Sequence, residues 1–380
     1  MANTLTNLTP DLYEALDTVS RELVGMIPAV TLDASAERAA KGQIVRSPVA
    51  PASTAADIVA ATNAPDTGDQ SIANKTISIS KARAVPVRMN GEEQRGLNTG
   101  PGYRNILRDQ FAQAMRTLTN EVETDLTALY SGMSRANGGA GTTPFGTAGN
   151  FTDASNSLQI LKDNGAPLTD NQLIIGTAAG AKMLGLQSRI DIQGNDSMLR
   201  QGVLLSTAGM DIRESAQVVN HSSNGTTDGN YVTDGIQAVG STSITVQTGT
   251  GTILAGTVIT FAGDDNKYIV DADYAGGAGD VSIAAPGLVA AVADSVAITE
   301  GAAYAANMAF NRSAIALVTR APARPEEGDS ADDVMLMTDP RSGLTFEVSL
   351  YKEYRRVHYE IGLAWGVSLI KPEHAAVLLG

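Results

Sequence analysis

The three histidines of the chain are its clearest candidates for acid–base chemistry, because imidazole titrates near neutral pH. His221, His358 and His374 stand far apart, and no zinc-protease, nucleophile-elbow, phosphate-loop or dinucleotide motif surrounds any of them. A serine–histidine–aspartate site can be built from residues distant in sequence, so a hydrolase with dispersed catalytic residues stays open at this point. Nothing singles out a nucleophile, and we predict a protein that is not an enzyme and binds no cofactor.

Aspartates form the second group with chemical potential, since carboxylate oxygens are the ligands that calcium prefers. They cluster between residues 264 and 280, as Asp264, Asp265, Asp271, Asp273 and Asp280. The Asp-x-Asp pair at 271–273 lacks the glutamate that closes an EF-hand loop. We interpret these carboxylates as solvated turn residues and predict no metal site. The glycine-rich stretch 132–150 likewise lacks the Gly-Lys-Ser/Thr of a phosphate-binding loop.

Basic residues flank a segment that reads as a long hairpin, and they suggest recognition rather than catalysis. The set is Arg46, Lys81, Arg83 and Arg88. We predict that they pair with acidic groups of a neighbouring subunit, for which Glu92, Glu93 and the 326–333 loop are candidates. The alternative is that they are solvated strand residues, worth about 0–1 kcal/mol each.

Composition excludes several functional classes. The 380-residue chain has a formal net charge of −14, with 41 acidic and 27 basic residues, which argues against a surface that grips nucleic acid or anionic membrane along its length. Cysteine is absent, so disulfides and thiolate sites are excluded. No apolar run reaches the roughly 18 residues of a membrane span. Without a basic-then-apolar signal at the start, we expect an intracellular protein.

The elements that would position these groups are a long helix and an extended hairpin. Residues 103–131 place apolar side chains at steps of three and four, which predicts one amphipathic helix of roughly 40 Å. Its polar face is predicted to include Glu123 and Thr127. Residues 43–47 and 75–80 read as strands of a hairpin with too few large side chains for its own core, so we expect it to rest on the body or on another subunit.

Residues 222–300 differ in composition from the rest of the chain, because Lys267 is their only basic residue. Short strand-like runs alternate there with turn clusters, which predicts a small all-β barrel or sandwich inserted into the body. Elsewhere, helical and strand patterns are mixed without a strict βαβ rhythm. The predicted fold class is therefore α+β.

Several short motifs resemble those of tailed-bacteriophage major capsid proteins, in the same order along the chain. They are residues 3–6 (NTLT), 91–94 (GEEQ), 120–123 (NEVE), 140–145 (AGTTPF), 163–167 (DNGAP), 212–215 (IRES), 308–312 (MAFNR) and 316–319 (ALVT). The short-tailed-phage coat protein with an inserted β-domain is the type that the chain resembles most.

The resemblance implies the Hong Kong 97-like capsid fold with an inserted small all-β barrel domain. It divides the chain into an N-terminal arm (1–42), an extended E-loop hairpin (43–90), a spine helix and peripheral domain (91–150), the first part of an axial domain (151–223), the inserted barrel (224–300) and a return to the axial and peripheral domains (301–380).

The resemblance also implies function and partners. Such proteins form hexamers and pentamers that close an icosahedral shell around double-stranded DNA, held without sequence-specific binding. A scaffolding protein, a portal protein and a decoration protein are the implied partners, with assembly in the host cytoplasm and a final place in the virion. We expect a separate scaffold and no covalent cross-links. Two alternatives remain: a nanocompartment shell that encloses a protein cargo, and a secreted adhesin or binding protein built around the β-domain.

Overall fold

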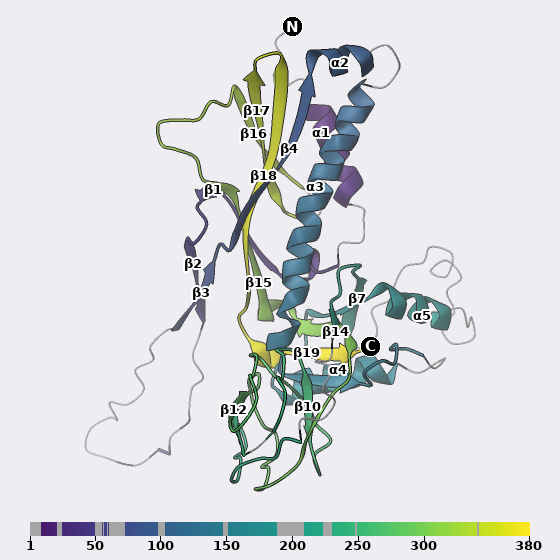
Figure 1. The fold of residues 1–380 in the computed structure, drawn as a ribbon, viewed down its shortest axis with the longest axis vertical. Helices are drawn as coiled ribbons and strands as arrows, with labels where there is room; N and C mark the ends of the chain where they lie inside the picture. The colour runs from purple at the N-terminus through teal and green to yellow at the C-terminus, as the bar shows by residue number, and fades with distance from the viewer. Residues whose placement is uncertain are drawn as a thin grey trace.

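The structure is a computed structural model, and it describes residues 9–20, 25–49, 55, 57–58, 60, 73–97, 103–146, 151–187, 209–222, 230–247, 249–339 and 342–380. The molecule is elongated and mixes helices with antiparallel and parallel strands (Figure 1). An upper layer of helix on sheet stands above a second sheet, and a β-rich region lies at the lower end. The α+β class predicted from the sequence is confirmed.

A single long helix runs through the upper half of the molecule. Helix α3 spans Tyr103–Thr127 and continues as the 3₁₀ helix η3, Ala128–Gly132. The predicted apolar stripe is buried along its length, from Leu107 through Phe111 and Met115 to Leu126, each at most 1% exposed. The helical prediction for residues 103–131 is confirmed.

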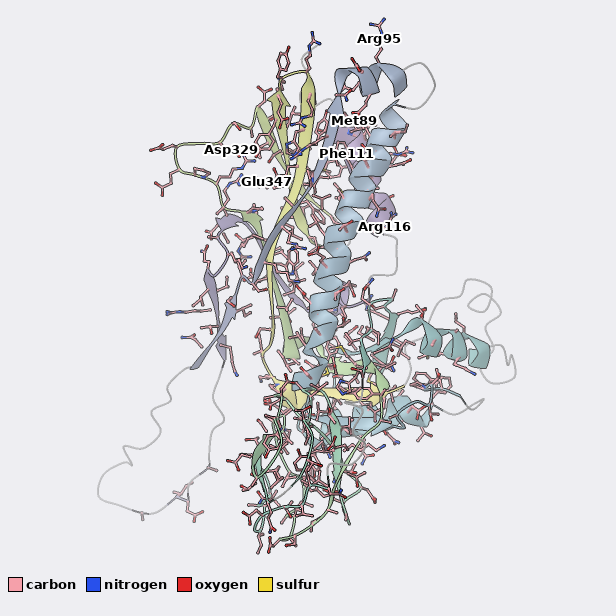
Figure 2. All side chains as sticks on the ribbon, viewed as in Figure 1. Met89, Arg95, Phe111, Arg116, Asp329 and Glu347 are labelled. Atoms are coloured by element: carbon pink, nitrogen blue, oxygen red, sulfur yellow. The ribbon has the colours of Figure 1, made fainter. Side chains whose placement is uncertain are left out.

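Helix α3 covers one face of a six-stranded sheet. The strands are β1 (Thr31–Ala39), β15 (Ile315–Pro322), β18 (Arg356–Leu369), β17 (Thr345–Glu353) and β16 (Asp333–Thr338), in this order, with β4 (Lys81–Asn90) also paired to β18. Alternation decides which side chains face the helix. On β4, Val87 and Met89 are buried under α3, whereas Arg88 between them is exposed. Phe111 of α3 meets Tyr359 of β18 edge to face, with ring centroids 5.2 Å apart (Figure 2).

The N-terminal segment packs on this layer. Helix α1 (Thr9–Ser20) lies against α3 and buries Leu12 and Leu16. Glu14 of α1 accepts a hydrogen bond from Arg108 of α3 at 2.8 Å. After the 3₁₀ helix η2 (Ile27–Ala29), strand β1 joins the sheet parallel to β15.

The predicted hairpin is present and shorter than expected. Strands β2 (Ile44–Val49) and β3 (Ala73–Ser78) pair only with each other among the described strands. Its base packs on the body, where Ile77 is 3% exposed beside Val318. Strand β4 belongs to the six-stranded sheet, so the hairpin ends at Ser78 rather than at residue 90. Most of its tip lies outside the described residues.

A second sheet lies below the first and contains strands distant in sequence. Its order in the described chain is β13 (Ile298–Glu300), β10 (Val258–Phe261), β11 (Lys267–Ile269), β5 (Arg135–Gly138), β19 (Ala375–Leu379), β14 (Tyr304–Asn311), β6 (Asn171–Ile175) and β7 (Met210–Glu214), with β8 (Asn220–His221) on β14. Helix α4 (Thr152–Asp163) packs on β19 and β14, and helix α5 (Thr177–Gln187) follows β6.

Residues 230–300 form the predicted all-β region with a hydrophobic core of their own. Strand β9 (Ser243–Val246) pairs with β12 (Gly279–Ser282). Single bridges extend these pairings: Val270 to Ile283, Thr233 to Val246, and Val232 to Ala297. The pairings therefore run in a circuit from β9 through the 232–233 segment, β13, β10, β11 and β12 back to β9. Through the β11–β5 pairing, the same strands continue into the sheet of the body.

Candidate assembly surface

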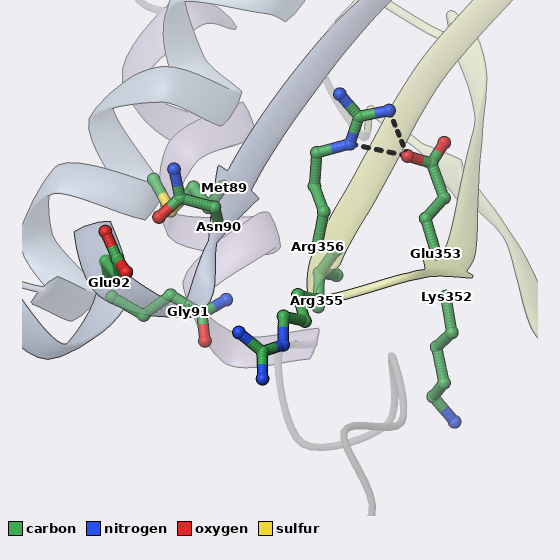
Figure 3. A pocket seen from close by; sticks show the side chains of 10 residues that line it. Met89, Asn90, Gly91, Glu92, Lys352, Glu353, Arg355 and Arg356 are labelled. Atoms are coloured by element: carbon green, nitrogen blue, oxygen red, sulfur yellow. Dashed lines mark hydrogen bonds and ion pairs between the residues drawn. The ribbon is translucent and has the colours of Figure 1, made fainter.

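The upper tip of the molecule contains an open cavity between two turns of the chain (Figure 3). Its volume is about 730 Å³. The lining comes from the end of β4, the start of helix α2 (Gly91–Leu97) and the β17–β18 hairpin: Met89, Asn90, Gly91, Glu92, Gln94, Lys352, Glu353, Arg355, Arg356 and Val357. Most of these residues are charged or carry an amide, while the larger part of the exposed lining surface is apolar. The cavity therefore offers both apolar surface and polar groups to a segment of another protein.

Local sequence explains how α2 begins at this cavity. Asn90 is the N-cap, because its Oδ1 accepts the backbone N–H of Glu93 at 2.8 Å, and Glu93 Oε2 accepts the N–H of Asn90 at 2.8 Å. This reciprocal pair is a capping box. The backbone N–H of Gly91 also donates to the carbonyl of Arg355 at 3.2 Å, which joins the two turns. Glu93 is thus engaged within its own helix, while Glu92 is exposed and lines the cavity.

The charges of the opposite rim are partly paired. Arg356 Nε lies 2.5 Å from Glu353 Oε2, and this hydrogen bond lowers the pKa of the Glu353 carboxyl. Lys352 pairs with Asp332. Arg355 takes the left-handed conformation, with φ of 55°, and its guanidinium lies 5.7 Å from the ring centroid of Tyr354. Tyr354 is 89% exposed.

Two of the predicted contact residues have partners inside the chain. Lys81 Nζ lies 2.7 Å from Asp125 Oδ1, and the other oxygen of Asp125 accepts the indole N–H of Trp365 at 2.8 Å. Arg83 forms a forked pair with Glu121, at 3.1 and 3.2 Å. Both acidic partners belong to α3, so these bases fasten β4 to the long helix, and neither Glu92, Glu93 nor the 326–333 loop is their partner within the chain.

The other two predicted bases lie on exposed strand positions. Arg46 stands opposite Thr76 on the hairpin, and Arg88 stands opposite His358 beside the tip cavity. Neither contacts an acidic side chain within the described part of the molecule. For Arg46, Arg88 and Glu92, contact with a neighbouring subunit stays a prediction.

The acidic loop after β15 projects from the side of the sheet and is tied to it near Asp329 (Figure 2). Asp329 accepts the hydroxyl of Tyr351 at 2.8 Å and lies 3.9 Å from Arg324, and the hydrogen bond from Tyr351 lowers the pKa of the Asp329 carboxyl. Burial and this hydrogen bond raise the pKa of Tyr351 to about 12. Arg324 also reaches the buried Glu347 at 2.9 Å, and Arg38 approaches the same carboxylate at 2.5 Å. The loop is therefore anchored by charge pairs on both sides.

A buried carboxylate that sequence reasoning placed on the polar face joins three parts of the chain. Glu123 of α3 is 0% exposed, and so is Thr127, because the arm and residues 215–217 cover this side of the helix. Glu123 Oε1 accepts the backbone N–H groups of Met26 and Ile27, both at 2.9 Å, and Oε2 accepts the hydroxyl of Ser215 at 3.0 Å. Burial raises the pKa of the Glu123 carboxyl. The only sequence signal was the 120–123 motif, which does not specify burial.

His221 and the acidic cluster, which the sequence offered as candidates for acid–base chemistry or metal binding, form hydrogen bonds to neutral groups of the fold. His221 is buried, with Nδ1 2.9 Å from the hydroxyl of Tyr130 and Nε2 3.2 Å from Thr257 Oγ1, and neither partner is a carboxylate. Burial lowers the pKa of its imidazole. In the acidic cluster, Asp264 accepts the hydroxyl of Tyr268 at 2.7 Å, and Asp273 accepts a backbone N–H at 2.7 Å. Among the described residues, no group of three or more His, Asp or Glu side chains is arranged to hold a metal ion.

Comparison with known proteins finds similarity only among solved structures. No protein-family model matches the chain, and no curated protein matches it. A protein of Mycobacterium phage Che8 is 13% identical, with 89% of this chain and 85% of that chain covered and a TM-score of 0.45. The capsid of cyanophage P-SCSP1u is 12% identical, with 92% and 86% covered and a TM-score of 0.47. A virus-like particle from Pyrococcus furiosus is 12% identical, with 97% and 98% covered and a TM-score of 0.46.

Phage capsids are among the structures to which this chain is similar. In the described part of the chain, no helix combines the length and apolar character needed to cross a membrane.

Proposed function

We propose that this chain is a major capsid protein of a tailed phage, with the Hong Kong 97-like fold and an inserted β-barrel. In this proposal α3 is the spine helix, the β2–β3 hairpin is the extended E-loop, and residues 230–300 are the barrel domain. Hexamers and pentamers of the chain form an icosahedral shell around double-stranded DNA. The sequence motifs shared with this class support the proposal.

The hairpin is the observation that carries it. Strands β2 and β3 pair only with each other within the described chain, and Ile44 is 56% exposed and Ile58 fully exposed. A two-stranded ribbon is marginally stable in water without a hydrophobic cover. Among the described residues of the hairpin, Ile77 and Val45 pack on the body sheet at its base. A second subunit would cover the exposed apolar side chains of the hairpin. In a shell, the hairpin of each subunit would pack on one neighbour, and the hairpin of another neighbour would pack on that subunit.

A shell can be built from contacts that are individually weak. An exposed ion pair contributes about 0–1 kcal/mol, too little to hold two subunits together alone. In a closed assembly each subunit meets several neighbours, so weak contacts act together, and each bound partner stabilises the folded form by mass action. Function then resides in many surfaces rather than in one pocket.

Net charge is consistent with a DNA container. DNA-binding proteins neutralise phosphates with clustered lysines and arginines, and each such contact makes binding more sensitive to salt. A chain with a net charge of −14 would enclose DNA without adhering along its length. The scaffolding, portal and decoration proteins implied by the resemblance are the proposed partners, and the virion is the proposed location.

Electron microscopy of the protein, expressed with and without its genomic neighbours, tests the proposal. We expect closed shells of uniform size, or shells that become uniform when one neighbour is coexpressed, and nuclease-protected DNA in particles from infected cells. Shells that contain an enzyme instead of DNA would favour a nanocompartment. A stable monomer under every condition would refute the shell function.

A further inference from the structure

The tip of the molecule presents two side chains of the kinds that dominate protein interfaces. Tyr354 and Arg355 form the turn between β17 and β18, and both are exposed. Tyrosine and arginine are enriched at interface hot spots. Tyrosine covers a large area at a small entropic cost, and arginine adds a planar group with five hydrogen-bond donors. Arg88 on the adjoining strand and the 730 Å³ cavity extend this surface. Among the described residues, Arg88 and Arg355 have no acidic partner, so two unpaired basic side chains stand at this tip, beside the exposed Glu92 of the cavity.

A matching acidic turn projects from the same chain. The backbone N–H of Gly328 donates to the carbonyl of Pro325 at 3.1 Å, and Gly328 takes the left-handed conformation, with φ of 93°. These contacts close a tight turn with Glu326 and Glu327 at its corners, both exposed. Neither glutamate contacts a basic group among the described residues. Because Asp329 is anchored to the sheet, the turn is ordered before it binds, which lowers the entropic cost of association.

The Glu326–Glu327 turn and the Tyr354–Arg355 tip do not contact each other within one chain. The end of the loop is tied to the rim of the cavity by the Asp332–Lys352 pair, while the 325–328 turn lies farther along the loop. In Figure 2, Asp329 marks the loop at the side of the sheet and Arg95 marks helix α2 at the top. Within the described chain, neither glutamate of the turn forms an ion pair with Arg355 or Arg88, so both groups are available to a second molecule. Two different surfaces of this kind join identical molecules head to tail, and such contacts form a ring when the rotation between neighbours closes and an open filament when it does not.

We propose that the Glu326–Glu327 turn of one copy binds the Tyr354–Arg355 tip and adjoining cavity of a second copy. The proposal rests on the shell function proposed above and names one of the contacts that would build it. A second copy of this chain is the proposed occupant, because the acidic turn and the unpaired Arg355 and Arg88 belong to the same chain and are complementary in charge. In the contact, the two glutamates approach Arg355 and Arg88.

Charge reversal followed by charge exchange tests this pairing in shell assembly. Glu326→Lys/Glu327→Lys and Arg88→Glu/Arg355→Glu should each reduce the yield of closed shells by at least about tenfold, because every subunit of the shell repeats the contact. Combining all four substitutions should restore the yield to within about threefold. Full assembly by either double variant, or no recovery in the folded quadruple variant, would overturn the pairing while leaving the shell function intact.

Cross-linking tests the contact independently of shell formation, since the chain has no cysteine. Chains with Glu327→Cys and with Arg355→Cys are mixed, at high concentration, under oxidising conditions. We expect a disulfide-linked heterodimer in the mixture and little dimer from either variant alone. Glu327→Cys mixed with Leu168→Cys, another exposed position, is the matched control. Equal cross-linking in the control, or dimers only from Arg355→Cys itself, would refute the head-to-tail contact.

A final variant separates the contact from folding. Arg355 holds a left-handed backbone that glycine adopts without strain, so Arg355→Gly should leave the turn intact. We expect a melting temperature at or above that of the parent protein and a loss of shell yield of at least threefold. Unchanged assembly by this variant would show that the arginine side chain has no part in the contact.

Discussion

Glu123 offers the sharpest test of how the N-terminal arm, the long helix and the lower sheet are held together. The Glu123→Ala change removes the acceptor for the N–H groups of Met26 and Ile27 and for the hydroxyl of Ser215. Each buried donor left without a partner costs about 1–3 kcal/mol. Water that enters the space will satisfy some of them, so we expect a total loss of about 3 kcal/mol. That is a large share of a typical domain stability of about 5–15 kcal/mol.

Glu123→Gln is the informative companion variant. Its carbonyl oxygen can still accept from Met26 and Ile27, and its amide can donate to Ser215, so the geometry is retained without the charge. Burial raises the pKa of Glu123 above the value of 4.5 for a free side chain, so the folded protein binds this proton more tightly than the unfolded chain. Stability from this group is therefore fully present below about pH 4.5 and is lost as pH rises through the folded pKa.

The expected result is a stability difference that changes with pH. Glu123→Gln should match the parent protein at pH 4 and become relatively more stable toward pH 8, by about 1.4 kcal/mol for each unit of raised pKa. Urea unfolding of unassembled protein, followed by fluorescence of Trp365 in the upper sheet, measures both variants. A Glu123→Ala loss below about 1 kcal/mol, or a parent protein that stays more stable than Glu123→Gln at pH 8, would refute this account.

Three further predictions concern other buried contacts. Asp125→Ala should leave the buried indole N–H of Trp365 without a hydrogen-bond acceptor and lower the free energy of unfolding by about 1–3 kcal/mol. The urea midpoint should then fall to a lower concentration. Burial lowers the pKa of His221 below 6.5, so its stability contribution is present above pH 6.5 and declines as pH falls; His221→Gln should remove this dependence in hydrogen-exchange protection of the β-rich region. Gly366→Ala would place a Cβ 2.2 Å from the Ser78 carbonyl oxygen, so we expect a displaced, protease-sensitive hairpin and no shells.

Each of these predictions has a matched control or a contradicting result. Asp125→Asn keeps an acceptor for the indole and should lose less stability than the alanine variant. Unchanged pH dependence in His221→Gln would assign the effect to another group. For the glycine, Gly185→Ala meets no atom within 4 Å in helix α5 and should leave assembly intact. Normal shells from Gly366→Ala would show that the hairpin base tolerates displacement.

Local patterns predicted the elements that depend on local geometry. The stripe from Leu107 to Leu126 repeats with the period of a helix, and that period alone predicts α3. Alternation around Ile77 predicted the hairpin, and its lack of large residues predicted that it needs support from elsewhere. Short strands with frequent turns predicted the β-rich region, although its pairing with β5 could not be inferred from its own composition.

Charge partners were the part that sequence could not specify. Lys81 and Arg83 were predicted to face a neighbouring subunit, but the alternation of β4 turns both toward α3, where Asp125 and Glu121 lie about forty residues away in the chain. Glu93 was predicted as a contact residue, and it is used in the capping box of its own helix. Arg46, Arg88 and Glu92 remain exposed, in keeping with the prediction and without testing it.

By itself, the amino-acid sequence determined the long helix, the hairpin, the composition of the β-rich region and the absence of cysteine chemistry, because each depends on residues close together in the chain. Only the tertiary structure decided that Glu123 is buried, that Arg355 lines a cavity, and that Asp329 ties the 325–328 turn to the sheet. The physical reason is that burial and charge pairing depend on which distant segments pack together. A helical period shows which residues share a face, but not what covers that face.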